Sequence, residues 1–265
     1  MWVQLPPGLL IKIKLMDNLI KNNGRIFCLG DIHGELDKLN NLLDKLDIKP
    51  SDSFVFLGDY VDRGLDSYGV IERLLTLNKT NKCVFLAGNH DVAFFDDTRF
   101  RSELPLVNYK MDGEKYRYTL WNQGAKETYK SYVAAGKDPS VHFKFYEMLE
   151  PYYILELDRE KHLFVHGGYN RHELIEDQKN KNIFWWDRDL LAAAIAHSNR
   201  TVDDAYPFKN KDRFKYVYVG HTPVTHWGYD KPTLFRNVFA LDTGVGKYKD
   251  SILYALEVTT QILIK

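Results

Sequence analysis

The chain has little cysteine, no net charge and no long hydrophobic run. Cys28 and Cys83 are the only cysteines among 265 residues, and each lies in a short apolar stretch. We therefore expect two buried, reduced thiols and no disulfide framework. A chain of this length buries roughly three quarters of its unfolded surface and needs no such crosslink to fold. Reduced thiols fit a reducing compartment, and we expect a cytoplasmic protein.

Charges of the two signs balance, with 36 Lys and Arg against 36 Asp and Glu. A neutral chain has no overall basic field, which argues against nucleic acid as a partner. The apolar runs are far shorter than the roughly 20 residues of a membrane-spanning helix, so we expect no membrane partner. Any phosphate binding must come from charges gathered locally. The oligomeric state is left open.

The first 24 residues differ from the pattern that follows them. Their apolar patch is interrupted by Lys12 and Lys14, and they lack the small-residue cleavage pattern of a secretory signal. We expect residues 1–24 to form an extension, with Met16 as an alternative start. Residues 25–265 are expected to form one domain.

Short apolar runs of strand length recur along that domain. They are rich in β-branched and aromatic side chains and comprise Ile26–Leu29, Phe54–Leu57, Val84–Leu86, Leu163–Val165 and Tyr216–Val219. Continuous apolar runs are typical of strands buried on both faces. Apolar residues at helical spacing over residues 36–46, and again over Ser67–Leu77, separate the first three runs. This alternation predicts an α/β layered fold.

Residues 96–150 interrupt the alternation of strand and helix patterns, because they are rich in tyrosine and charge. Helical patterns over Tyr118–Ala135 and Val141–Leu149 predict a helical insertion on the main domain. We expect its tyrosines to pack it against the body, with a substrate lid as the alternative. Strands resume after Tyr152. The tail is typical of a β-meander, with strands expected at Val238–Leu241, Ile252–Val258 and Gln261–Ile264.

A polar cluster follows each of the five predicted strands. The clusters are GDIHG at 30–34, GDYVDRG at 58–64, GNHD at 88–91, HGG at 166–168 and GHT at 220–222. In open α/β sheets, ligands bind at the carboxyl ends of the strands, so these segments are expected to meet at one rim. Carboxylate, imidazole and amide groups suit divalent manganese, iron or zinc, and the lack of cysteine argues against a structural zinc site. The ligands outnumber what one ion with an open position can use, which predicts two ions.

Taken in this order, the five segments resemble the motifs of the calcineurin-like metallophosphoesterase superfamily. The DRG ending of the second segment is similar to the phosphoprotein phosphatase branch, especially bacterial and bacteriophage Ser/Thr protein phosphatases. The resemblance implies a four-layer αββα sandwich with two mixed sheets and a helical insertion. It also implies hydrolysis of phosphomonoesters by a hydroxide that bridges two divalent ions, manganese first and iron or zinc as alternatives.

The resemblance further implies the metal ligands. The first ion would be held by Asp31, His33 and Asp59. The second would be held by Asp59, Asn89, His166 and His221. Asp59 would then bridge the two ions.

The same resemblance implies catalytic and substrate-binding roles. His90, paired with Asp62, would be the general acid. Phosphate would be bound by Arg63, Asn89 and Arg188, since an arginine fork matches two phosphate oxygens. Asp62 has an alternative role as a helix cap, although Asp66 or Ser67 fills that position better. Arg188, in the segment FWWDR, has an alternative as a surface helix residue.

One departure from the family pattern concerns the substrate. The third segment ends in Asp91, where most eukaryotic-type protein phosphatases have glutamate and diadenosine tetraphosphate hydrolases often have aspartate. We expect a serine/threonine protein phosphatase acting on a phosphoprotein or a small phosphorylated substrate. The alternatives are a dinucleoside tetraphosphate hydrolase and, third, an inactive binding module. No predicted ligand is missing, which argues against the inactive module.

Overall fold

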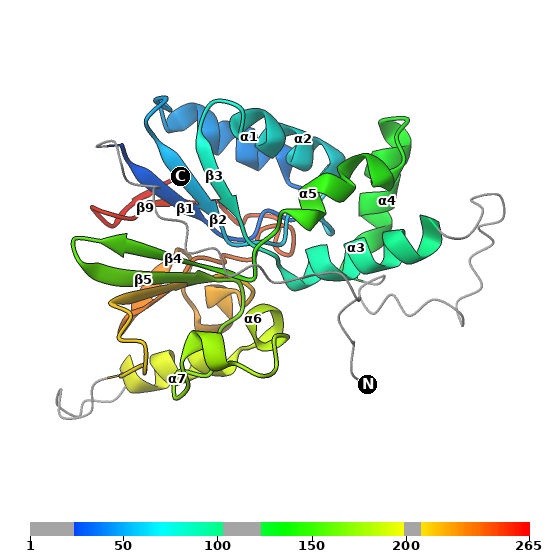
Figure 1. The fold of residues 1–265 in the computed structure, drawn as a ribbon. Helices are drawn as coiled ribbons and strands as arrows, with labels where there is room; N and C mark the ends of the chain where they lie inside the picture. The colour runs from blue at the N-terminus through cyan, green and yellow to red at the C-terminus, as the bar shows by residue number, and fades with distance from the viewer. Residues whose placement is uncertain (1–23, 103–122, 199–207) are drawn as a thin grey trace.

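The computed structural model describes residues 24–102, 123–198 and 208–265 (Figure 1). The expected extension, including Met16, lies outside these residues except for Gly24. Two five-stranded mixed sheets pack face to face in the described part of the chain, with helices on the outside. No helix in the described ranges is long and apolar enough to cross a membrane.

The first sheet joins the start of the domain to its end, in the strand order β10-β9-β1-β2-β3. Three strands run parallel, namely β1 (Ile26–Leu29), β2 (Ser53–Phe56) and β3 (Lys82–Phe85). Two antiparallel strands complete it, namely β9 (Ala255–Glu257) and β10 (Ile262–Ile264). The first three predicted strands are therefore confirmed.

The second sheet has the order β4-β5-β6-β8-β7. Its parallel centre consists of β5 (Glu160–Val165), β6 (Tyr216–Val219) and β8 (Val238–Ala240). Its antiparallel edges are β4 (Tyr152–Leu157) and β7 (Thr233–Phe235). The predicted β-meander is wrong, because β8 pairs with β6 and β7 while β9 and β10 belong to the other sheet. Residues 241–254 cross from one sheet to the other.

Alternating side chains of the strands build the layers. On β1 and β2, Cys28 and Val55 belong to the core between the sheets, together with Phe164 and Tyr218 of the second sheet. The rings of Phe164 and Tyr218 stack at 4.4 Å between centroids. Neighbouring residues such as Phe27 point to the opposite face, as period-two alternation requires. Both faces of the central strands are buried, which is why their sequences are continuously apolar.

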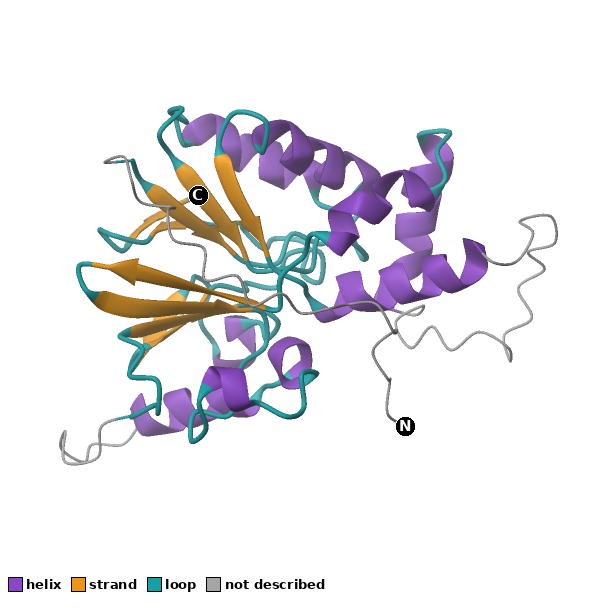
Figure 2. Cartoon of the chain, in the orientation of Figure 1, coloured by secondary structure: helices purple, strands orange, loops and turns teal. Residues whose placement is uncertain are grey.

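Helices cover the two outer faces (Figure 2). On the first sheet lie α1 (Leu36–Lys45) and α2 (Ser67–Leu77), and on the second lie α6 (Ile183–Trp186) and α7 (Asp189–Ser198). The Asp66 side chain caps α2 by accepting the Gly69 N–H at 2.7 Å, so Asp62 does not serve as that cap. The four-layer αββα arrangement expected from the sequence is present.

A third group of helices lies beside the ends of the sheets (Figure 1). It contains α3 (Asn89–Ser102), α4 (Ala125–Ala134) and α5 (Phe143–Glu147), the last preceded by a 3-10 turn at Pro139–His142. α3 begins at the third motif itself. α4 packs against α2, and Tyr132 contacts both Tyr68 and Phe94 through its ring. Tyr132 therefore packs against the body as expected, whereas Tyr109, Tyr116 and Tyr118 lie outside the described residues.

Candidate metal centre

The five motif segments all follow parallel strands and meet where the two sheets and the α3–α5 group converge. Several of their residues have a left-handed backbone, with φ of 47° at His33, 53° at Asp59, 72° at Asp62, 67° at Arg63 and 64° at His221. Such conformations are uncommon outside glycine and cluster at functional sites. The backbone turns sharply at these residues, and their side chains form one buried cluster.

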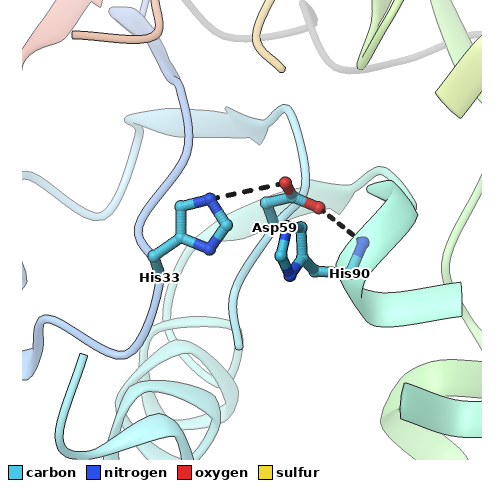
Figure 3. A group of neighbouring side chains, drawn as sticks. All are labelled: His33, Asp59 and His90. Atoms are coloured by element: carbon cyan, nitrogen blue, oxygen red, sulfur yellow. Dashed lines mark hydrogen bonds and ion pairs between the residues drawn. The ribbon is translucent and has the colours of Figure 1, made fainter. Parts of the chain in front are cut away.

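Asp59 lies at the centre of this cluster (Figure 3). The residue is 1% exposed, and Oδ2 is 3.5 Å from Nε2 of both His33 and His166. The Oδ1 atom accepts the backbone N–H of His90 at 2.9 Å. One carboxylate therefore contacts histidines delivered by both sheets. Gly88 permits this approach, since a Cβ there would overlap the Asp59 carboxylate.

Two groups of metal-type ligands share Asp59. One contains His33, Asp59 and His90, and the other contains Asp59, His166 and His221; within each group the ligand atoms lie within 4.8 Å of one another. The Asn89 Oδ1 atom adds to the second group, 3.2 Å from His166 Nε2. The residues predicted to hold the second ion therefore lie close together.

The first group differs from the prediction, because His90 is found where Asp31 was expected. Asp31 Oδ2 is 3.7 Å from His33 Nε2 and has no hydrogen-bond partner among the described residues. His90 has both ring nitrogens engaged, with Nδ1 2.7 Å from Asp62 Oδ2 and Nε2 3.1 Å from the Arg63 guanidinium. The free acceptor on Asp31 favours it over His90 as the ligand.

Hydrogen bonds set the tautomers of two histidines. His33 Nδ1 lies 2.8 Å from the Val61 carbonyl, and His166 Nδ1 lies 2.9 Å from the Leu57 carbonyl. A carbonyl oxygen only accepts, so each Nδ1 carries the proton. Nε2 of His33 accepts from the Arg63 guanidinium and so has its lone pair available, whereas Nε2 of His166 would have to give up its proton to ligate a metal.

Arg63 contacts the same cluster from the other side. Its guanidinium donates to Nε2 of His33 at 2.7 Å and to Nε2 of His90 at 3.1 Å. Burial, followed by the Arg63 charge, holds the pKa of His33 well below its usual range. An ion at His33 Nε2 would need the lone pair that Arg63 now binds, so ion binding requires this guanidinium to move.

The buried charges of the cluster are strongly perturbed. Burial raises the pKa of Asp31, and the neighbouring Asp242 carboxylate raises it further. Burial also lowers the pKa of His166, but the Asp59 carboxylate outweighs it and raises the pKa to about 9. Burial and His166 lower the pKa of His221 to about 2. Buried carboxylates held this close together are stabilised by cations.

Unpartnered polar atoms give a further test of whether ions fit. Asp31 Oδ2, His221 Nε2 and Asp242 Oδ2 are buried and have no hydrogen-bond partner in the described part of the chain. Buried polar atoms are almost always satisfied, and each exception calls for an explanation. Oxygen and imidazole donors aimed at one space suit divalent ions of intermediate hardness. The residues present fit two such ions.

Two supporting carboxylates were not predicted as functional. Asp91 accepts the backbone N–H groups of Asp59 at 2.6 Å, Tyr60 at 2.9 Å and Gly88 at 2.9 Å, and so joins the second motif to the third. The second is Asp242, which is buried close enough that its carboxylate raises the pKa of Asp31. Its position two residues after the end of β8 matches the strand-end placement of the motif residues and is the signal that could have found it.

A cavity of 530 Å³ opens beside the cluster. Its polar and aromatic lining includes Arg63, Arg188, His221, Thr222, Trp227 and Lys247. Arg188 lies between α6 and α7 and donates to Thr222 Oγ1 at 2.9 Å. The two arginines predicted to bind phosphate thus share one cavity with a predicted metal ligand, whereas Asn89 does not line it.

The chain belongs to the calcineurin-like phosphoesterase family, whose model matches residues 24–225. It is therefore a hydrolase of phosphate esters in a family that uses divalent metal ions, and the described residues contain histidine and aspartate groups suited to bind them.

Relatives of two kinds are similar to it. The bis(5'-nucleosyl)-tetraphosphatase PrpE [asymmetrical] of Oceanobacillus iheyensis is 26% identical over 233 residues, which is 83% of this chain and 84% of that protein. The serine/threonine-protein phosphatase 6 catalytic subunit of Caenorhabditis elegans is 34% identical over 91 residues, covering 34% of this chain and 28% of the relative.

Solved structures share the fold. A candidate diadenosine tetraphosphatase matches with a TM-score of 0.58 at 18% identity, covering 92% of this chain and 93% of that one. A cold-active protein tyrosine phosphatase matches with a TM-score of 0.50 at 15% identity, covering 88% and 74% respectively.

Proposed function

We propose that the chain is a phosphatase that uses two divalent ions, manganese first, to hydrolyse phosphomonoesters. The observation that carries the proposal is the Asp59 carboxylate, which contacts histidines of two separate ligand groups at 3.5 Å each. The first ion would be held by Asp31, His33 and Asp59, and the second by Asp59, Asn89, His166 and His221. Ions held by these residues would supply a water of lowered pKa and positive charge for the phosphoryl oxygens.

Arg63 and Arg188 would bind the phosphate. Both line the 530 Å³ cavity next to His221, so a phosphate there can reach the two guanidinium groups. Two ions bring four positive charges, Asp31 and Asp59 remove two of them, and the arginines add two more. A phosphate dianion therefore meets net positive charge, although the whole chain is neutral.

His90 would protonate the leaving oxygen, with Asp62 holding its ring at 2.7 Å. The Arg63 guanidinium now donates to His90 Nε2, the nitrogen that faces away from Asp62. Movement of Arg63 onto a bound phosphate would release that nitrogen and also His33 Nε2. The Arg63 side chain would then couple phosphate binding to the release of His90 Nε2 for proton transfer.

Replacing Arg63 with lysine should raise KM and lower kcat, because a single ammonium cannot bind two phosphate oxygens as a fork does. We expect a loss of about tenfold or more in kcat/KM with p-nitrophenyl phosphate. The melting temperature should change little. Arg73→Lys on α2 is a matched control, since Arg73 bonds Asn40 away from the cavity. Parental kinetics in Arg63→Lys would show that the fork geometry is not used.

Two substrate classes fit this site. The first is phosphoserine or phosphothreonine on protein, as the DRG ending of the second motif suggests. The second is a dinucleoside tetraphosphate, which is supported by the relative that aligns over 83% of the chain and by Asp91 at the third motif. The cavity also supports the second, since Lys247 offers charge for further phosphates and Trp227, which is 38% exposed, offers an aromatic ring for a base.

Manganese-loaded protein assayed with a phosphothreonine peptide and with diadenosine tetraphosphate would separate the two classes. We expect the higher kcat/KM with the phosphopeptide. Trp227→Ala and Lys247→Ala should then leave turnover of p-nitrophenyl phosphate unchanged. If diadenosine tetraphosphate is the better substrate and both variants lose it selectively, the second function replaces the first.

A further inference from the structure

Helix α4 of the insertion reaches the second motif through one buried threonine. Thr128 is fully buried, on the same face of α4 as Ala125 and Tyr132. Threonine is a poor helix former, and a buried hydroxyl needs a hydrogen-bond partner. Its partners therefore indicate why a polar residue occupies this position.

The Thr128 hydroxyl holds Asp62 at two points. Its Oγ1 donates to Asp62 Oδ1 at 2.7 Å and accepts the Asp62 backbone N–H at 2.8 Å. The Ser67 hydroxyl lies 3.1 Å from Thr128 Oγ1. The other carboxylate oxygen of Asp62 is the one that lies 2.7 Å from His90 Nδ1. A continuous chain thus runs from the hydroxyl through the carboxylate to the imidazole.

The backbone of this loop also depends on α4. Asp62 and Arg63 are consecutive non-glycine residues with φ of 72° and 67°, a conformation that persists only where the surroundings hold it. The Arg63 N–H donates to the Gly124 carbonyl at 3.3 Å, one helical turn before Thr128. Gly124 has φ of 112°, and a Cβ there would overlap the Arg63 backbone. Glycine at this position lets the helix come close enough for Thr128 to reach Asp62.

We propose that Thr128 is a positioning residue for catalysis, which fixes the carboxylate of Asp62 and through it the ring of His90. The inference rests on the proposed general-acid role of His90. The insertion is then part of the catalytic apparatus, although neither Thr128 nor its neighbours on α4 belong to any of the five motifs. A role in packing alone would be served as well by a side chain of the same shape without a hydroxyl.

The test compares Thr128→Val, which keeps the shape, with Thr128→Ser, which keeps the hydroxyl. We expect Thr128→Val to lower kcat on phenyl phosphate by about tenfold or more, the scale typical of supporting hydrogen bonds. The loss on p-nitrophenyl phosphate should be smaller, because that leaving group departs without a proton. Thr128→Ser should restore most of the activity. Thr98→Val is the matched control, because Thr98 is a buried helical threonine whose hydroxyl donates to the Phe94 and Phe95 carbonyls of its own helix.

A second measurement does not require turnover. The NMR resonance of the His90 Nδ1–H proton can be assigned in the metal-free protein by its loss in His90→Gln. This resonance should shift or broaden in Thr128→Val and keep its chemical shift in Thr128→Ser and Thr98→Val. If Thr128→Val does not fold, Thr128→Ala takes its place. An unmoved His90 resonance would overturn the inference. Failure of the parent to hydrolyse either ester would instead overturn the proposed function, and the resonance would still decide the role of Thr128.

Discussion

Asp59→Asn is expected to lower kcat/KM by more than the roughly 10–100-fold that outer-shell changes at metal sites cost. The variant should also bind fewer than two ions per chain. The reason is that one carboxylate contacts His33 and His166 at 3.5 Å each, so its charge serves both ligand groups. A neutral amide removes that charge from both. Elemental analysis and steady-state kinetics on the same preparation measure the two effects.

The fold should survive this substitution. An asparagine oxygen can still accept the His90 backbone N–H that Asp59 Oδ1 accepts at 2.9 Å. Asp66→Asn is the matched control, because asparagine caps a helix about as well as aspartate and Asp66 lies at the start of α2. If Asp59→Asn retained parental turnover and two ions, Asp59 would not be the shared ligand.

His90→Gln should show a loss that depends on the leaving group. A general acid contributes about 10²–10⁴-fold in rate, or roughly 3–5.5 kcal/mol of barrier. An alkoxide or phenolate of high pKa needs that proton, whereas p-nitrophenolate does not. The variant should therefore be severely slowed on phenyl phosphate and on a phosphoserine peptide, and less so on p-nitrophenyl phosphate. Asp62→Asn should follow the same trend more weakly.

Metal content decides between two roles for His90. A ring nitrogen of His90 lies within 4.8 Å of the possible ligand atoms of His33 and Asp59, so a role as a ligand is geometrically open. We expect His90→Gln to keep two ions, because the unpartnered Oδ2 of Asp31, 3.7 Å from His33 Nε2, offers the third ligand of the first ion. Exposed His172→Gln is the control. Loss of an ion together with equal losses on both esters would make His90 a ligand and remove it as the acid.

Local patterns predicted the parts of the fold whose causes are local. Ser67–Leu77 is helical in the structure at the predicted bounds, because its apolar spacing and its Asp66 cap are contained in the segment. The short apolar strand at Ile26–Leu29 is likewise as predicted, since its continuously apolar composition indicates burial on both faces. The rim of motif residues followed from a general rule of parallel sheets.

Long-range contacts were beyond such patterns. The three tail strands were predicted to pair with one another in a meander. Pairing of short strands depends on which sheet has an unpaired edge strand nearby, and β8 pairs within the second sheet. Thr128 carries no motif, and its partner Asp62 is 66 residues away. Asp91 was noted only as a family difference, although its carboxylate joins two motif loops. These roles depend on the packed backbone and not on the neighbouring sequence.

A metal titration of chelator-treated protein tests the central claim most directly. Turnover of p-nitrophenyl phosphate and bound metal would be measured on the same samples as manganese is added. The two-ion site predicts no turnover without metal and a maximum reached at two ions per chain. Full turnover at one ion per chain, or turnover by metal-free protein, would contradict it.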